Sequence, residues 1–205
     1  RVFGVEPVAP ELLRRQALAL IDKMAIHAVK IGIPGSAANA AVIAQLVRQL
    51  RQARPDVPVV LDPVLASGHG DVLSRDDAVL ALAPLLPLTT VIVPNGPEAL
   101  ALGGVENLRA QGCQHVLVTG GHGDGEAVLN RWFDAEGGER EWRWPRLPGE
   151  FHGSGCTLAS AIAARLALGQ ALPEALDQAQ SYSHAALAGA YAIAPGQLMP
   201  QRFFT

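Results

Sequence analysis

The chain has 205 residues, of which 49% are hydrophobic, enough for one large domain with a sizeable core. The formal net charge is −3 and the arginines are dispersed, so the sequence has no basic stripe. We therefore do not expect a nucleic acid as partner. The sequence shows no apolar run of membrane-spanning length and no signal peptide, and its two cysteines make no disulfide framework. We therefore expect a cytoplasmic protein without a membrane partner.

The first residues already read as structured sequence, although the chain begins at Arg1, so we expect an N-terminal portion to be missing. Apolar residues at helical spacing predict a helix from about Pro10 to Met24, and the apolar run 27–33 predicts a buried strand. A second helix is expected over residues 36–54. A strand over residues 57–62 follows it, with β-branched side chains that favour extended structure.

The middle of the chain continues this alternation. Ser74 and Asp77 form a capping pattern that predicts a helix through Leu86. Strands are then expected over residues 89–93 and 115–119, with a helix beginning at Glu98 and a segment 103–112 that is short for a crossover helix. Alternating strands and helices predict a parallel sheet covered by helices on both faces.

After Thr119 the pattern changes. A turn over residues 120–125 leads into a predicted hairpin of strands 127–134 and 139–144, joined at residues 136–138. Trp132, Trp142 and Trp144 have strand spacing and are expected to pack against the sheet rather than to stack on a base. Two helices, about 155–168 and 173–192, complete the pattern, so the fold class expected is a single α/β domain over residues 1–205.

Polar residues follow the predicted strands, at the edge where open α/β sheets bind their ligands. Asp62 either bonds its own backbone in a turn or holds Mg²⁺ through its carboxylate. Asn95 and Glu98 have the spacing of a capping box; alternatively, Asn95 lies near phosphates and Glu98 near the same metal as Asp62. The glycine-rich run 119–125 is either a strand-exit loop or a backbone surface for a nucleotide.

The run His152-Gly153-Ser154-Gly155-Cys156 precedes small and apolar residues that predict a helix ending at Gly169. Glycines at a helix N-terminus leave free N–H groups, which with the helix dipole favour an anion. Cys156 would lie in the first turn, where the pKa of a thiol tends to fall. The simpler alternative is a small buried cysteine after a glycine turn.

Five segments, taken in order, resemble the ribokinase-like superfamily, and most closely its hydroxymethylpyrimidine/phosphomethylpyrimidine kinase branch. They are Val29-Lys30-Ile31-Gly32-Ile33, Val60-Leu61-Asp62-Pro63-Val64, Val93-Pro94-Asn95-Gly96-Pro97-Glu98-Ala99, Val116-Leu117-Val118-Thr119-Gly120-Gly121-His122 and His152-Gly153-Ser154-Gly155-Cys156-Thr157-Leu158. The last is specific, because most of the superfamily carries Asp at the place of Cys156.

The resemblance implies a central, mainly parallel sheet flanked by helices, with a small hairpin near the nucleotide. It also implies transfer of the γ-phosphoryl group of ATP, with Mg²⁺, to 4-amino-5-hydroxymethyl-2-methylpyrimidine and then to its monophosphate. The roles it implies are an anion hole and catalytic thiol (Gly153, Ser154, Gly155, Cys156), ATP and phosphate contacts (Asn95, Glu98, Thr119, Gly121), metal ligands (Asp62, Glu98) and pyrimidine contacts (Ile33, Val64). A homodimer is expected as well.

Two departures from the family pattern stand out. Many relatives carry Lys where this chain has Thr119, and the family's first strand, Gly-rich turn and helix are not in this sequence. Three rival functions stay open. They are a pyridoxal or pyridoxine kinase, a thiol enzyme with Cys156 as nucleophile and His152 or His122 as base, and a ligand-sensing relative without turnover.

Overall fold

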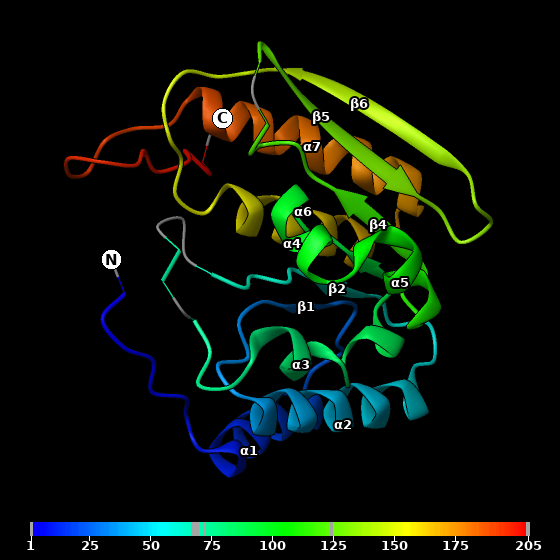
Figure 1. Ribbon diagram of the computed structural model, residues 1–205. Helices are drawn as coiled ribbons and strands as arrows, with labels where there is room; N and C mark the ends of the chain where they lie inside the picture. The colour runs from blue at the N-terminus through cyan, green and yellow to red at the C-terminus, as the bar shows by residue number, and fades with distance from the viewer. Residues whose placement is uncertain (1, 67–69, 72, 124, 204–205) are drawn as a thin grey trace.

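Six strands form a single mixed sheet in a computed structural model that describes residues 2–66, 70–71, 73–123 and 125–203. The strand order is the chain order (Figure 1). β1 to β4 run parallel to one another, β5 runs antiparallel to β4, and β6 runs antiparallel to β5. The strands are β1 (Val29–Ile31), β2 (Val59–Leu61), β3 (Val91–Ile92), β4 (His115–Val118), β5 (Ala127–Phe133) and β6 (Glu139–Pro145).

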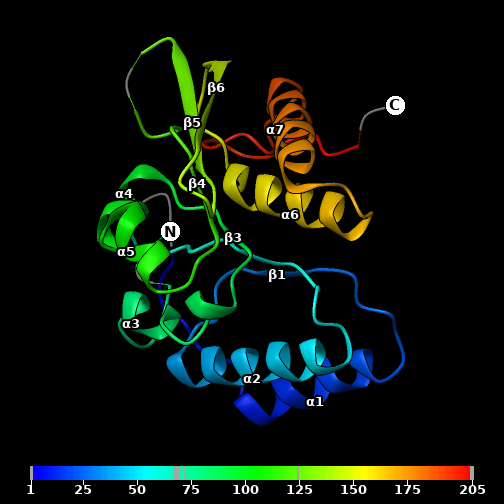
Figure 2. The ribbon, with the colours of Figure 1, turned by 90° about the vertical axis from the view of Figure 1, so that its right-hand side faces the viewer.

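Helices cover both faces of this sheet, as Figure 2 shows. Because β1 to β4 are added in one direction and such crossovers share one hand, their connecting helices fall on the same face. That face carries α2 (Ala37–Ala53), α3 (Ala78–Leu82), the 3₁₀ turn η1 (Leu86–Leu88), α4 (Gly96–Ala101) and α5 (Gly104–Ala110), with α1 (Pro10–Ile21) against α2. The opposite face carries α6 (Ser154–Ala167) and α7 (Leu172–Ala188).

Each face has its own core of buried side chains. Ala44 of α2 and Leu108 of α5 belong to one cluster, together with Leu61 and Ile92 from the strands. Val60, Leu117 and Trp132 point to the other face, where they join Ile162 of α6 and Leu176 of α7 in the second cluster. The alternation of Val60 and Leu61 between the two clusters is the two-residue period of a strand buried on both sides.

The alternation of strands and helices predicted from the sequence is confirmed, with shorter strands than expected. The helix predicted from Ser74 to Leu86 was wrong in its start and length. Asp77 is the N-cap, since its side chain accepts hydrogen bonds from the amides of Val79 and Leu80 at 2.9 and 3.1 Å, and α3 ends at Leu82. Ser74 instead accepts a hydrogen bond from the amide of Asp76 at 3.3 Å, which closes a turn.

The predicted hairpin is also confirmed, and it continues the main sheet. Phe133 of β5 pairs with Val116 of β4, and the β5–β6 ladder runs on to Ala127 and Pro145. The three tryptophans pack as expected: Trp132 lies between His115 and Trp142, with ring centroids 5.6 and 6.4 Å away, and Trp144 stacks on His184 of α7 at 5.1 Å.

Candidate active site

Asp62 lies at the carboxyl edge of the sheet, immediately after β2. Its amide donates to the carbonyl of Ile31 at 2.9 Å, and only 4% of the residue is exposed. The Lys30 ammonium on the neighbouring strand lies 3.0 Å from Asp62 Oδ2. A buried carboxylate requires such a partner, because the desolvation of an unpaired charge is costly. Sequence analysis did not select Lys30; its signal was that one of only two lysines in the chain stands inside an apolar predicted strand.

The start of α6 faces this carboxylate. Gly153 is the N-cap with φ of +75°, a conformation that glycine adopts without strain. The first amide that bonds back is that of Thr157, to Gly153 O at 2.9 Å, so the amides of Ser154, Gly155 and Cys156 have no partner within the helix. A Cβ built on Gly155 would lie 4.0 Å from Asp62 Oδ1. The predicted helix start is therefore confirmed and lies beside Asp62.

Cys156 is exposed as a residue, although its sulfur is partly shielded from water, and Asp62 lies beside the thiol. Burial of the sulfur raises its pKa, and the charge and hydrogen bond of Asp62 raise it further, whereas Lys30 and Arg202 act in the opposite direction. The expectation of a lowered pKa was therefore wrong. Loss of hydration and repulsion by the Asp62 carboxylate both disfavour the thiolate, and together they outweigh the attraction of the helix N-terminus. At neutral pH Cys156 is a thiol that can donate its proton.

Glu98 and Asn95 form the capping box that their spacing predicted. The Asn95 amide donates to Glu98 Oε2 at 2.8 Å, and the Glu98 amide donates to Asn95 Oδ1 at 2.8 Å. Burial raises the pKa of the Glu98 carboxyl. The hydrogen bond from the Asn95 amide lowers it, the Asp62 charge raises it, and a hydrogen bond from the Leu65 amide lowers it. The cap therefore holds Glu98 within electrostatic reach of Asp62.

Thr119 lies beside Asn95, at the end of β4. Its amide donates to Pro94 O at 2.9 Å, and an isolated parallel bridge joins it to Asn95. The next two residues form the strand-exit loop: the Gly120 amide donates to Asn130 Oδ1 at 3.1 Å, and Gly121 O accepts from Arg146 Nη1 at 2.9 Å. Asp124 of this loop lies outside the described residues.

The loop is held by a buried amide that sequence analysis did not select. Asn130 of β5 also donates to Gln180 Oε1 of α7 at 2.8 Å. A Cβ on Gly120 would lie 2.2 Å from Leu129 O, so only glycine fits this close approach. The sequence signal was a polar residue inside an apolar strand.

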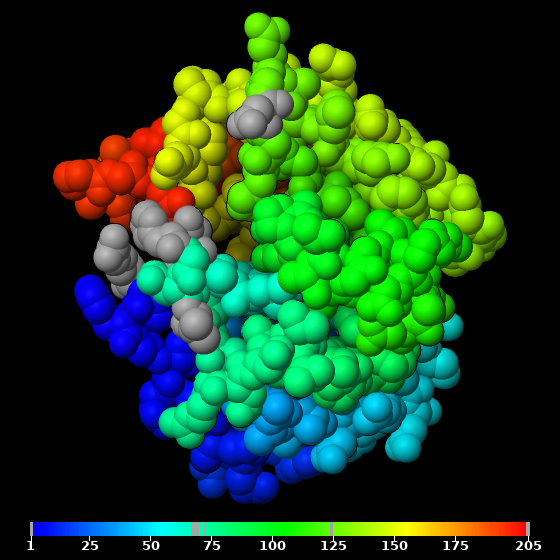
Figure 3. Space-filling view, in the orientation of Figure 1, coloured from blue at the N-terminus to red at the C-terminus, as the bar shows by residue number. Residues whose placement is uncertain are grey.

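Ile33 and Val64 follow β1 and β2, which pair in register at Ile31 and Leu61. Both therefore lie at the same edge of the sheet. Ile33 is 49% exposed, which is unusual for so large an apolar side chain, and Val64 is half-buried. Figure 3 shows that the segment after β2, α4 and the start of α6 surround a hollow on this side of the molecule.

Arg202 reaches the same place from the C-terminal tail. Its Nε donates to Thr157 Oγ1 at 3.1 Å, and its Nη2 is 3.2 Å from the position of a Cβ on Gly153. No local pattern could have found this residue, because it is separated by 45 positions from its partner. The groups that act on Cys156 are Asp62, Lys30 and Arg202, whereas His152 and His122, both described, are not among them.

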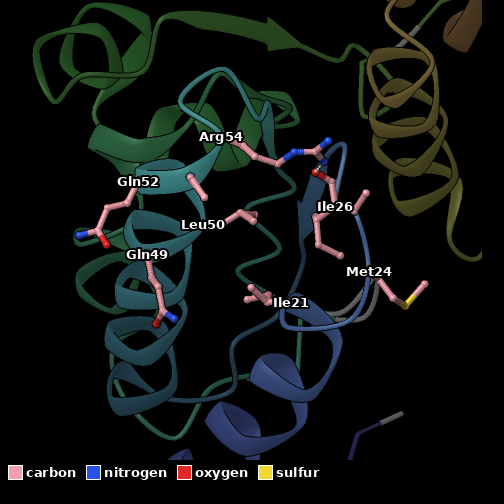
Figure 4. Close-up of a pocket in the computed structure, with 9 residues that line it drawn as sticks. Ile21, Met24, Ile26, Gln49, Leu50, Gln52 and Arg54 are labelled. Atoms are coloured by element: carbon pink, nitrogen blue, oxygen red, sulfur yellow. Dashed lines mark hydrogen bonds between the residues drawn. The ribbon is translucent and has the colours of Figure 1, made fainter.

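A cavity of about 590 Å³ lies at the opposite edge of the sheet, between the end of α1 and the end of α2 (Figure 4). Its lining includes Ile21, Ile26, Leu50 and Gln49, and Arg54 donates from Nη1 to Ile26 O at 2.6 Å. None of the predicted site residues lines it. The concavity therefore does not coincide with the titratable groups.

Two features bear on metals and membranes. Among the described residues, His, Cys, Asp and Glu side chains do not gather in groups of three or more that could hold a metal ion. In that same part of the chain, every helix is too short or too polar to cross a membrane.

Comparison with known proteins agrees with this geometry. The chain matches the phosphomethylpyrimidine kinase family over residues 1–200. It is 36% identical to a hydroxymethylpyrimidine/phosphomethylpyrimidine kinase of Rhizobium meliloti, covering 96% of this chain and 77% of the relative. The corresponding kinase of Streptomyces coelicolor is also 36% identical, over 95% of this chain and 75% of the relative.

Solved structures show the same fold. A phosphomethylpyrimidine kinase from Clostridium difficile 630 superposes with a TM-score of 0.73 at 29% identity, covering 91% of this chain and 80% of that one. The pyridoxal kinase of Bacillus subtilis superposes at 0.86 over 97% of this chain and 79% of that one; at 24% identity this likeness concerns the fold alone. With its motifs gathered at one edge of a ribokinase-like sheet, the chain belongs to the phosphomethylpyrimidine kinase family.

Proposed function

We propose that this protein transfers the γ-phosphoryl group of ATP to 4-amino-5-hydroxymethyl-2-methylpyrimidine and to its monophosphate, in thiamine biosynthesis. The observation that carries the proposal is the juxtaposition of the open amides of α6, the Cys156 thiol and Asp62 at one edge of the sheet. Family membership supports it independently.

The start of α6 would hold the group in transfer. Phosphoryl transfer is governed by positioning and charge stabilisation, since the protein has little covalent work to do. The amides of Ser154, Gly155 and Cys156 have no helical partner and receive the charge that spreads over the equatorial oxygens. Gly153 provides the left-handed turn that exposes these amides.

Cys156 would orient the acceptor and carry its proton. In the proposed step the acceptor oxygen forms a bond to the γ-phosphorus as the bond to ADP breaks. The hydroxyl proton passes to Cys156 Sγ while the thiol proton passes to water, to which Cys156 is exposed. The raised pKa of Cys156 fits a thiol that relays a proton rather than one that stands as a free thiolate. General base assistance of this kind contributes roughly 10²–10⁴-fold.

Asp62 and Glu98 would hold Mg²⁺. Mg²⁺ is bound by one or two carboxylates together with substrate phosphates and water, which fits a pair of acids rather than a larger ligand cluster. The charge of Asp62 raises the pKa of Glu98, so a cation between the two would relieve their repulsion. When bound, the metal neutralises charge on the polyphosphate.

The remaining residues would bind the two substrates. Asn95, Thr119 and Gly121 form one corner of the edge and are assigned to the nucleotide. The Staphylococcus aureus pyridoxal kinase, which has the same fold, has been solved with ADP and with AMP-PCP, which supports ATP as the donor. Ile33 and Val64 are assigned to the flat face of the pyrimidine. We also propose that the enzyme acts as a homodimer in the cytoplasm, which light scattering and cell fractionation would test.

ADP formation tests the proposed activity. The protein is incubated with ATP, with and without Mg²⁺, and with the hydroxymethylpyrimidine, its monophosphate or pyridoxal as acceptor. We expect turnover with both pyrimidines and loss without Mg²⁺. Glu98→Gln keeps a capping acceptor and should need more Mg²⁺, whereas Glu106→Gln in α5 should not. Turnover with pyridoxal alone would overturn the choice of substrate.

Variants of Cys156 test its role. Cys156→Ala should lower kcat by about 10²-fold or more while changing ATP affinity little. Cys156→Asp should retain transfer, because a carboxylate can also accept the proton, whereas a nucleophilic thiol mechanism predicts loss in both. Cys113→Ala is the control: it removes the buried thiol and should leave kcat unchanged. Wild-type turnover of Cys156→Ala would refute the assignment.

A further inference from the structure

The candidate site requires more positive charge than its lysines supply. The sequence contains only Lys23 and Lys30. Lys30 already lies 3.0 Å from Asp62 Oδ2, so its charge is largely neutralised by that carboxylate. A triphosphate donor and a phosphorylated acceptor would together bring several negative charges to this edge. In addition to the Mg²⁺ proposed at Asp62 and Glu98, a further cation is therefore expected near the start of α6.

Arg202 is positioned to supply it. Its Nε donates to Thr157 Oγ1 at 3.1 Å, and that hydroxyl in turn donates to Gly153 O at 2.8 Å. These bonds fix the inner edge of the guanidinium. The outer edge lies against the helix start, where Nη2 is 3.2 Å from the Cβ position of Gly153. The guanidinium is thus held against the helix start, between Gly153 and Thr157.

The tail that carries Arg202 is anchored at several points. Arg202 O accepts a hydrogen bond from the Tyr182 hydroxyl at 2.9 Å, and the Gln201 amide donates to Ala186 O at 2.8 Å, both on α7. Leu198 forms a parallel bridge with Phe151, just before the glycine run. The backbone at residue 202 is therefore fixed relative to α6.

The charge of Arg202 is not used by an acid of the described chain. The ion pairs found within residues 2–66, 70–71, 73–123 and 125–203 do not include it. The residue is exposed, and its positive charge acts on the Cys156 thiol. An arginine whose two Nη groups remain available beside a helix N-terminus has the geometry to bind phosphate oxygens.

We propose that Arg202 binds a phosphoryl group held at the start of α6, as a second cation beside Lys30. The inference rests on the proposed kinase function. The group is either the γ-phosphate of ATP or the phosphate already carried by the monophosphate acceptor. Thr157 acts as the positioning residue, since it holds Nε and leaves both Nη groups for the ligand.

Arg202→Met tests this inference against Arg165→Met. Arg165 lies in the last turn of the same helix and carries the same charge, about 17 Å from the site at 1.5 Å per residue. Calorimetry compares the affinities for ADP and AMP-PCP, which differ by the γ-phosphate. Steady-state kinetics gives kcat and KM for each pyrimidine acceptor. Thermal unfolding verifies that both variants are folded.

Losing a charge-assisted hydrogen bond should weaken phosphate binding by roughly 10- to 100-fold. If Arg202 binds the donor, Arg202→Met loses the preference for AMP-PCP over ADP. If it binds the acceptor phosphate, KM rises for the monophosphate alone. Arg202→Lys keeps the charge but not the fork and should recover part of the loss.

The inference is overturned if Arg202→Met matches Arg165→Met in both measurements while the wild type phosphorylates pyrimidines. Failure of the proposed function gives a different result. In that case the wild-type protein forms no ADP with either pyrimidine.

Discussion

The two edges of the parallel sheet differ in how they use their polar groups. At the carboxyl edge, Lys30 pairs with the buried Asp62, and the thiol of Cys156 lies beside both. At the amino edge, arginines instead donate to the backbone: Arg51 Nη2 to Val57 O at 3.1 Å and Arg54 Nη1 to Ile26 O at 2.6 Å. Charges at one edge face each other, whereas those at the other hold loops together.

The largest concavity described above and the interacting titratable groups also lie at different edges. The cavity of about 590 Å³ lies at the amino edge and is lined mainly by aliphatic side chains and two glutamines. The two groups whose pKa values are raised by burial and by the charge of Asp62, Cys156 and Glu98, lie at the carboxyl edge with Asp62. Parallel strands explain this, since their connections return to one edge, where loops and helix N-termini meet. Four experiments test whether function is confined to that edge.

The largest effect is expected from the glycines at the two ends of α6. Gly153→Asp should reduce turnover by about 10²- to 10³-fold or more, because a carboxylate repels the phosphoryl group and would pair with the nearby Arg202 guanidinium. Gly169→Asp is the matched control, since Gly169 has φ of +81° and nothing within 4 Å of its Cβ position. It should cost about 1 kcal/mol of stability and no turnover. Equal kcat values for the two variants would remove the start of α6 from the site.

The thiols of Cys156 and Cys113 should differ strongly in their rates of alkylation. Only a thiolate reacts with iodoacetamide. Because the pKa of Cys156 is raised, its rate should be slow at neutral pH and climb about tenfold per pH unit beyond the range of an ordinary thiol. Burial raises the pKa of the Cys113 thiol to about 12, so this residue should react only after unfolding.

Peptide mass spectrometry after timed labelling at several pH values measures both rates. A Cys156 rate that levels off below pH 8, on the scale of ordinary thiols, would mean that the helix dipole prevails over burial and over Asp62. That result would restore the activated thiol as a nucleophile.

Removing a cation from either edge should lower stability, but only the removal at the carboxyl edge should also lower turnover. Lys30→Met leaves the buried Asp62 carboxylate unpaired and should cost roughly 1–3 kcal/mol and at least about tenfold in turnover. Arg51→Met loses hydrogen bonds to Val57 O and Thr90 Oγ1 and should cost about 1–2 kcal/mol with unchanged turnover per folded molecule. Urea unfolding and ADP formation at saturating ATP give the two quantities. A tenfold fall of turnover in Arg51→Met would contradict the division between edges.

The smallest effect is expected from filling space at each edge. Ile33→Trp at the carboxyl edge should raise the KM for the pyrimidine by about tenfold through overpacking, with kcat little changed. Ala53→Trp places the same ring in the cavity at the amino edge and should leave KM and kcat unaltered. An altered KM in the second variant alone would move acceptor binding to the cavity.

Local patterns determined most of the fold. The capping box at Asn95 and Glu98 and the helix start at Gly153 involve residues within four positions of each other, so short-range hydrogen bonding fixes them wherever the segment lies. The prediction of a helix starting at Ser74 was wrong, and here too the reason involves the choice of capping residue. Two acids compete there, and Asp77 caps α3 while Asp76 accepts a hydrogen bond from the amide of Ala37 at the start of α2.

The chemistry of the candidate site was decided by contacts between distant segments. The sequence by itself placed Cys156 at a helix start and predicted a lower pKa. The fold partly buries the sulfur and brings Asp62 against it, and these two effects reverse the shift of the pKa. Likewise, Lys30 meets Asp62 because β1 and β2 are neighbours, and Arg202 meets Thr157 because the tail crosses α7. Secondary structure follows from hydrogen bonds between near residues, but a pKa depends on every charge within a few ångströms, and only the tertiary structure assembles those.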